Sequence, residues 1–223
     1  MMQHGYVCPR ASDVVGAQRL FTRDQLSLDV ERVAVSLLGA TLSRTDCAGT
    51  VAVRIVEVEA YGGVGEDAAS HAHRGVTPRN RAMFESAGLL YVYVAYGVHW
   101  CLNVVCGPAG VGSAVLIRAG EVMVGEELAR RRRPSARSAV NFAQGPGNLS
   151  AALGVTGADS EHDLVSDSSA IQLWRPGAPT PREAIANGPR VGIRREVDRR
   201  WRWWLSTSPS VSRARKLTPH TPR

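Results

Sequence analysis

The stretch VAVRIVEVEAY, residues 51–61, is the strongest strand signal in the chain, and it contains two carboxylates. Because side chains alternate between the two faces of a strand, the odd-numbered residues are expected to share one face, an apolar row that ends in acids. This row consists of Val51, Val53, Ile55, Glu57 and Glu59. We expect Glu59 near the rim of the core, either as a partly desolvated base or in a salt bridge with an arginine.

Helix and strand patterns alternate on both sides of this stretch. Apolar residues recur at helical spacing from Leu26 to Leu38, and Gly39 is expected to end that helix in a left-handed conformation. The other predicted elements are strands at 40–45, 50–59, 89–94, 100–105 and 114–119, strands near Ile171 and Val191, a helix at 121–130, a short helix that follows the turn at 145–148 and runs through Leu153, and a Trp-rich segment at 201–205.

The length of 223 residues suits one sizeable domain, and no obvious linker divides the chain. We expect a single domain at 19–212, preceded by a flexible arm at 1–18 and followed by a disordered basic tail at 213–223. The centre of the chain is rich in strands and is flanked by helices, which indicates a mixed α/β fold.

The charge of the chain predicts an anionic partner. The formal net charge is +7 and the only lysine is Lys216, so arginine supplies almost all of the positive charge. Together with a pI near 9.8, this favours nucleic acid or an anionic surface as the partner. The alternative is an arginine-rich proteome that compensates for scarce lysine.

Cysteine spacing and hydropathy predict a soluble, cytoplasmic protein. The four cysteines show no C-x-x-C pairing and are expected to be free thiols: Cys8, Cys47, Cys101 and Cys106. No run of eighteen apolar residues exists, and the N-terminal region lacks the pattern of a signal peptide. We therefore expect no membrane association.

Four of the five tyrosines lie between residues 61 and 96. Tyr91 and Tyr93 are two apart and should share a strand face, whereas Tyr96 beside Gly97 is expected at a break or hairpin tip. Most aromatic residues in strands belong to a core. A tyrosine exposed at a tip could instead wedge between stacked bases, and Tyr61 and Tyr93 could then hold a base removed from the stack.

The loop at 62–80 is rich in glycine, acid and histidine and is long enough to suggest a function. His71 and His73 could supply two metal ligands, but no third ligand is evident. We therefore expect no metal site.

A series of short motifs runs along the chain from about residue 20 to residue 212. They are Val56–Tyr61, Ser70-His71, Thr77–Asn80, Met83-Phe84, Leu90–Tyr93 with Tyr96-Gly97, Cys101–Asn103, Leu116–Ala119 with Glu121, Gly145–Gly147 and Pro189–Ile193. In this order and spacing they resemble the alkyladenine (3-methyladenine) DNA glycosylase family. The resemblance implies one mixed domain of the α+β type, in which helices flank a curved, mainly antiparallel sheet.

The resemblance also implies a site that hydrolyses the bond between a damaged purine and its sugar. Glu59 matches the acid that orients and deprotonates the attacking water, and Arg118 matches an arginine near that water and a phosphate. The pocket residues that stack on the flipped base or touch its edge match Tyr61, His71 and Tyr93. Asn103 matches the amide that disfavours guanine-type bases, and Tyr96 matches the tyrosine inserted into the duplex.

Bond chemistry agrees with these implied roles. A carboxylate such as Glu59 can stabilise oxocarbenium character at the sugar while it activates water. A glycosylase that also nicks the strand generally uses an amine, yet Lys216 lies in the predicted tail, so we expect a monofunctional enzyme. The expected partner is damaged double-stranded DNA, with no cofactor and no second subunit.

Two positions depart from the family pattern, and two other functions stay open. His99 stands where an aromatic residue is usual, and Asn148 stands where relatives often carry lysine. One alternative function is a noncatalytic nucleic-acid-binding module that uses stacking tyrosines and arginines. The other is a metal-dependent hydrolase that uses His71 and His73.

Overall fold

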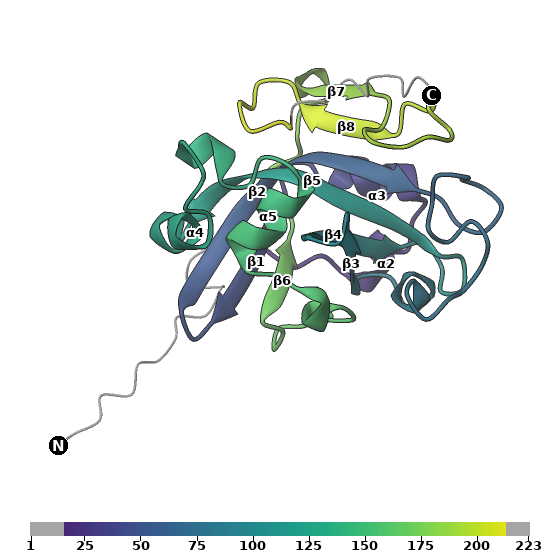
Figure 1. Cartoon of the computed structure of the whole chain (residues 1–223), viewed down its shortest axis with the longest axis horizontal. Coiled ribbons are helices and arrows are strands. Elements are labelled where there is room, and N and C mark those ends of the chain that lie inside the picture. Colours follow the sequence, from purple (N-terminus) through teal and green to yellow (C-terminus); the bar gives the residue numbers. More distant parts are fainter. Residues whose placement is uncertain (1–15, 213–223) are drawn as a thin grey trace, which may run out of the picture.

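The computed structural model describes residues 16–212 and shows an eight-stranded antiparallel sheet in that part of the chain (Figure 1). The strands are β1 (Thr41–Asp46), β2 (Gly49–Tyr61), β3 (Leu90–Ala95), β4 (His99–Cys106), β5 (Ser113–Val124), β6 (Ile171–Trp174), β7 (Ile185–Gly188) and β8 (Arg202–Leu205). The main order is β3-β4-β5-β2-β1-β6, and β8 joins β2 to β7. The long strands β2 and β5 form the centre of the sheet.

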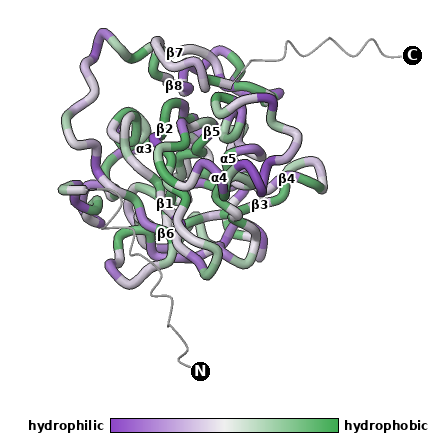
Figure 2. Tube along the Cα trace, turned by 90° about the vertical axis from the view of Figure 1, so that its left-hand side faces the viewer, coloured by the Kyte–Doolittle hydropathy of each residue, from purple (hydrophilic) through white to green (hydrophobic). Residues whose placement is uncertain are grey.

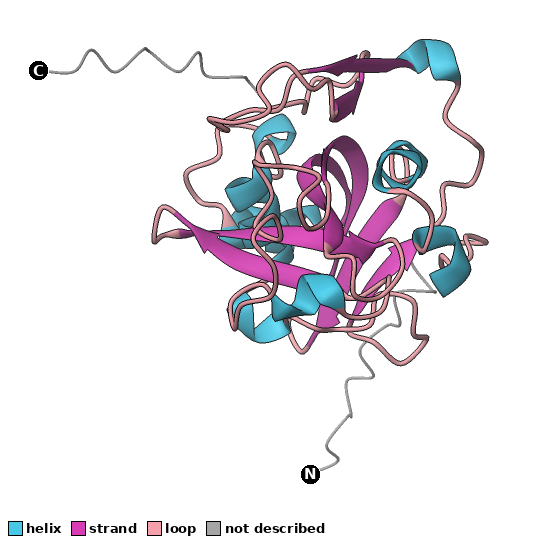
Figure 3. Cartoon of the chain, turned by 90° about the vertical axis from the view of Figure 1, so that its right-hand side faces the viewer, coloured by secondary structure: helices cyan, strands magenta, loops and turns pink. Residues whose placement is uncertain are grey.

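Short helices surround this sheet (Figure 3). The α-helices are α2 (Arg23–Leu26), α3 (Val30–Ser36), α4 (Glu126–Arg132) and α5 (Pro146–Leu153), and the 3-10 helices are η1 (Arg81–Phe84), η2 (Ala139–Asn141), η3 (Gly157–Asp159) and η4 (Arg182–Ala184). α5 packs on β4 and β5, while α3 packs on β2. Figure 2 shows apolar stretches along β2 and β5 in the middle of the molecule.

This architecture confirms the expected fold class, a single mixed domain in which helices flank a curved, mainly antiparallel sheet. The hairpin tip at Tyr96-Gly97 and the helix that ends at Leu153 are also confirmed. In the part of the chain that the structure describes, no helix is long and apolar enough to cross a membrane. Most of the expected arm and the whole expected tail lie outside the described residues.

The single helix predicted from Leu26 to Leu38 is wrong, because two helices occupy this region. α2 ends at Leu26, and Asp29 then caps α3 by accepting a hydrogen bond from the backbone N–H of Arg32. A helix start that is satisfied by an aspartate side chain competes with continuation of the preceding helix. Gly39 does have the left-handed conformation expected of it, with φ of 80°.

Two further boundaries differ from the prediction. Residues 121–124 continue strand β5, and the helix begins only at Glu126, after Gly125 turns the chain at a φ of 75°. No strand includes Val191, which lies in the irregular segment between β7 and β8. Its backbone N–H donates to a side chain instead of to a strand, as described below.

The predicted shared face of β2 is also wrong, for a reason that matters to the site. The pairing of β2 with β5 passes from Ile55 to Glu57, so Val56 is an additional residue, a β-bulge. One additional residue inverts the alternation of side chains. The apolar face therefore continues through Val56, Val58 and Ala60, which join the same core cluster as Ile55. Glu57, Glu59 and Tyr61 lie on the opposite face of the strand.

Candidate active site

Glu59 lies beneath the floor of a large cleft and has no exposed surface. Among residues 16–212, three donors reach its carboxylate. The Tyr61 hydroxyl donates to Oε2 over 2.9 Å, and a terminal nitrogen of Arg118 donates to the same oxygen over 3.3 Å. The backbone N–H of Val191 donates to Oε1 over 2.7 Å. Since a carboxylate offers about four acceptor positions, about one stays open for a further donor such as water.

Arg118 on β5 connects Glu59 to a second buried carboxylate. Its Nε donates to Glu57 Oε1 over 3.1 Å, and its second terminal nitrogen donates to Ser212 Oγ over 3.3 Å. Burial alone would lower the pKa of Arg118, but the charges of Glu59 and Glu57 outweigh this effect and raise that pKa above its ordinary value. Arg118 is therefore a fixed cation beside Glu59.

Tyr91, Tyr93 and His71 line one part of the cleft. The rings of Tyr91 and Tyr93 share a face of β3 and are 5.7 Å apart, as their spacing predicted. The His71 ring meets Tyr93 edge-on at 4.5 Å, and His71 Nδ1 lies 3.0 Å from the Tyr91 hydroxyl. Burial raises the pKa of Tyr91 to about 12, so this hydroxyl keeps its proton and can donate to Nδ1. In that arrangement the Nε2 of His71 carries the hydrogen and can donate to a ligand.

His71 comes from the long loop between β2 and η1, which has no regular structure. The buried amide of Asn80 holds this loop, because it donates to the carbonyls of His71 and Gly75 over 2.8 and 3.0 Å. The cleft walls partly desolvate the imidazole and Arg79 lies nearby, so the pKa of His71 lies below its ordinary value. His71 is therefore neutral at neutral pH.

A buried ion pair holds the Tyr61 ring. The Arg190 guanidinium lies 4.7 Å from the ring centroid and donates to both carboxylate oxygens of Asp67 and to the carbonyl of Ala60. Burial alone would raise the pKa of Asp67, but its hydrogen bonds and ion pair with Arg190 bring that pKa below its ordinary value. The pKa of Tyr61 lies well above its ordinary value because the phenol is buried beside Glu59. The Tyr61 ring is thus held in place, and its hydroxyl keeps its proton.

Asn103 on β4 has a fixed amide orientation. Its Nδ2 donates to the backbone carbonyls of Tyr91 and Cys101 over 3.1 and 3.4 Å. The side chain lines the cleft, and no donor among the described residues reaches its Oδ1. The acceptor end of the amide is therefore available to a ligand.

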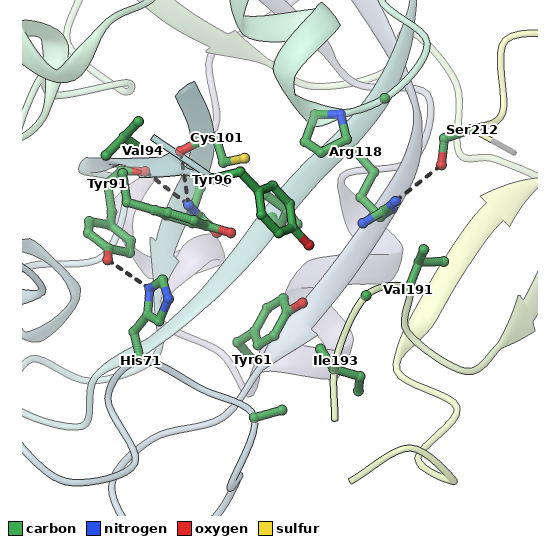
Figure 4. Close-up of a pocket in the computed structure, with 18 of the residues that line it drawn as sticks. Tyr61, His71, Tyr91, Val94, Tyr96, Cys101, Arg118, Val191, Ile193 and Ser212 are labelled. Carbon is green, nitrogen blue, oxygen red and sulfur yellow. Dashed lines mark hydrogen bonds between the residues drawn. The ribbon is translucent and has the colours of Figure 1, made fainter. Parts of the chain in front are cut away.

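Tyr96 stands at the tip of the hairpin between β3 and β4. It is 88% exposed and has a φ of 52°, a conformation that non-glycine residues rarely adopt. Such strain costs on the order of 1 kcal/mol and clusters at functional sites. Figure 4 shows the Tyr96 side chain among the residues that line the cleft.

The cleft has a volume of about 1250 Å³ and brings the predicted site residues together (Figure 4). Six of them line it directly, and Glu59 lies under Tyr61 and Arg118. The six are Tyr61, His71, Tyr93, Tyr96, Asn103 and Arg118. Three further arginines also line it: Arg79, Arg194 and Arg195. A flat, partly apolar ligand with an anionic attachment suits such a cleft.

The two departures from the family pattern meet at the turn that begins α5. A Cβ on Gly147 would lie 2.9 Å from His99, so only glycine lets the hairpin approach the turn this closely. The amide of Asn148 donates to the carbonyl of Gln144 over 2.7 Å, which braces the turn. These residues therefore contribute to the shape of the cleft wall.

Sequence reasoning missed four parts of the site. Tyr91 carried a usable signal, because it shares a strand face with Tyr93. The backbone N–H of Val191, the Arg190 side chain and Ser212 carried no local signal for their contacts, since each lies more than 90 positions from its partner in the site.

The two histidines considered as metal ligands lack a suitable neighbour. Across residues 16–212, no three or more His, Cys, Asp or Glu side chains are grouped so that they could hold a metal ion. His71 Nδ1 is instead within hydrogen-bond distance of the Tyr91 hydroxyl.

The sequence is similar to those of known proteins. Residues 24–209 match the family described as methylpurine-DNA glycosylase. A Nocardia farcinica protein is 49% identical over 203 residues, which cover 89% of this chain and 93% of the relative. Proteins of Frankia casuarinae and Streptomyces avermitilis are 48% and 44% identical, over 86% and 91% of this chain and 90% and 95% of their own lengths. All three are provisionally named 3-methyladenine DNA glycosylases.

Proposed function

The chain belongs to the methylpurine-DNA glycosylase family, and on that premise we propose that it is a monofunctional DNA glycosylase of base excision repair. It releases alkylated or deaminated purines of the 3-methyladenine and hypoxanthine type and leaves an abasic site. The observation that carries this proposal is the position of Glu59, a buried carboxylate directly beneath an aromatic cleft. That arrangement places a candidate base next to surfaces that can hold a purine.

The damaged nucleotide enters the cleft after rotation out of the duplex. Tyr96, exposed at its hairpin tip, takes the place of the extruded base between its neighbours. Tyr61 and Tyr93 then stack on the purine, and His71 contacts its edge. A mispaired or damaged base costs less to extrude, which contributes to selection.

Glu59 activates the water. The open acceptor position of its carboxylate takes a proton from water while the water oxygen bonds to the sugar carbon, and the bonding electrons of the broken C–N bond leave with the purine. The negative charge also stabilises the oxocarbenium character of the sugar. Arg118 orients Glu59 through the 3.3 Å hydrogen bond and adds a positive charge near the water and a phosphate.

The electronic character of the base contributes to selection. A purine that is alkylated on a ring nitrogen is cationic, so it leaves readily and stacks on tyrosine with an additional cation–π energy of roughly 0.5 to 2 kcal/mol. We assign the discrimination against guanine-type bases to the Asn103 side chain, whose orientation is fixed by hydrogen bonds to two backbone carbonyls.

We propose that the partner of this enzyme is damaged double-stranded DNA. We also propose that the enzyme is a monomer, lies in the cytoplasm and uses no cofactor. The net charge of +7 and the arginines at the cleft support binding to DNA. The proposed reaction needs only water and the side chains already named, which supports the assignment of no cofactor.

A strand-cleavage assay tests the proposal. A duplex with one hypoxanthine should be cleaved at the lesion by hot alkali after treatment with the protein, but not before alkali. Residues 16–212 contain no lysine, so borohydride should trap no covalent adduct between that part of the protein and DNA. Strands that resist alkali would contradict a glycosylase, and nicking without alkali or a trapped adduct would contradict the monofunctional assignment.

The lowered pKa of His71 predicts a pH-dependent choice between substrates. Because that pKa lies below its ordinary value near 6.5, the ring is neutral at neutral pH and becomes cationic only as the pH falls further. The imidazolium would repel cationic 3-methyladenine more than neutral hypoxanthine. Release of 3-methyladenine relative to hypoxanthine should therefore fall between about pH 7 and about pH 5.

The matched control for this pH effect is His71→Gln, which cannot gain the charge. For this variant, the ratio of released 3-methyladenine to released hypoxanthine should change with pH only as far as the stability of the two glycosidic bonds changes. Chromatography of the free bases over the same pH range measures this ratio. Identical pH curves for the wild type and this variant would exclude His71 as the source of the effect.

A further inference from the structure

Glu57 is a second buried carboxylate beside the site, and the chemistry above gives it no role. It lies on the same face of β2 as Glu59 and has no exposed surface. Two arginines from different strands pair with it, Arg118 of β5 at 3.1 Å and Arg202 of β8 at 2.6 Å. Burial of a carboxylate is costly unless charges and hydrogen bonds compensate it, and here both are present.

The segment after β8 completes this cluster. The backbone N–H of Ser212 donates to Glu57 Oε2 over 2.6 Å, and its hydroxyl donates to Glu57 Oε1 over 2.9 Å. The same hydroxyl accepts a hydrogen bond of 3.3 Å from Arg118. Ser212 thus links the second carboxylate to the arginine, and it also lines the cleft.

The positive and negative charges of this cluster are equal in number. Glu57 and Glu59 supply two negative charges, and Arg118 and Arg202 supply two positive charges, all of them buried. Arg118 lies between the carboxylates, with Nε on Glu57 and a terminal nitrogen on Glu59. Since a planar guanidinium bonds in fixed directions, the bond to Glu57 determines where the nitrogen that faces Glu59 lies.

We propose that Glu57 is a positioning residue of the glycosylase reaction, which together with Ser212 fixes the Arg118 guanidinium against Glu59. This proposal rests on the function proposed above and extends it. Glu57 touches neither water nor the base. It acts through Arg118, so its removal lowers the rate of base release and leaves DNA binding intact.

Glu57→Gln and Ser212→Ala test this role. We expect Glu57→Gln to slow single-turnover release of hypoxanthine by about tenfold, less than the loss of a donor that contacts the reacting atoms directly. Ser212→Ala keeps the backbone N–H bond to Glu57 and loses only the hydroxyl, so it should slow release about threefold. The affinity of both variants for a duplex with a stable abasic-site analogue should stay within about twofold of the wild type.

A double-mutant cycle with Arg118→Gln separates positioning from general support of the fold. If Glu57 acts through Arg118, Glu57→Gln should slow release by less than about twofold in the Arg118→Gln background. If Glu57→Gln does not fold, Ser212→Ala takes its place in the cycle with Arg118→Gln. Circular dichroism shows whether each variant is folded.

The outcomes are distinct. Folded variants that release the base at the wild-type rate would overturn the proposal, as would a loss that persists in full in the Arg118→Gln background. A wild-type protein that releases no base would instead remove the proposed glycosylase function itself.

Discussion

Glu59→Gln should reduce base release by at least about 10³-fold while the affinity for damaged DNA stays within about threefold of the wild type. The amide has the shape of the carboxylate but cannot take a proton from water, and it carries no charge to stabilise the sugar. Glu59 lies beneath the cleft and does not line it, so the surface that meets the DNA is unchanged. Release under single-turnover conditions and binding to an abasic-site analogue measure the two quantities separately.

Glu126→Gln is the matched control for this prediction. Glu126 makes an exposed ion pair with Arg130 on α4 and does not line the cleft, so the same chemical change there should leave release unchanged. A Glu59→Gln protein that turns over like the control would remove Glu59 from the role of base.

DNA affinity should fall steeply with salt. Arg79, Arg194 and Arg195 line the cleft, and three arginine–phosphate contacts give a slope of about −3 in log K against log salt. Between roughly 50 and 200 mM salt, this slope corresponds to a loss of about 60-fold in affinity. Fluorescence anisotropy of a labelled duplex over this range measures the slope.

The double variant Arg194→Gln/Arg195→Gln should bring that slope to about −1, since each phosphate contact contributes about one. Arg131→Gln removes an exposed arginine from α4 that does not line the cleft, and its slope should match the wild type. An affinity that does not respond to salt would make the positive charge of the chain irrelevant to its function.

Alternation and turn signals predicted most strands, but they could not predict where alternation changes. The bulge at Val56 depends on the register between β2 and β5, whose paired residues are more than 50 positions apart. Without it, Glu59 would belong to the apolar face, as the sequence pattern suggests. The break between α2 and α3 was more accessible, because Asp29 is a favoured N-cap residue.

The site was predictable to the extent that its residues carry local motifs. Tyr61, Tyr93 and Tyr96 could be singled out from the tyrosine pattern, and the family resemblance supplied Arg118 and Asn103. The contacts that hold these residues were not predictable. Arg190 under Tyr61 and Ser212 beside Arg118 come from distant segments, and only the folded chain brings them to the cleft.

Release of free base from duplex DNA in EDTA, with the wild type and Glu59→Gln assayed side by side, tests the central claim most directly. The account predicts that the wild type releases 3-methyladenine or hypoxanthine without added metal and that Glu59→Gln binds the same duplex but releases almost none. Release at equal rates by both proteins, or no release by the wild type, would contradict it.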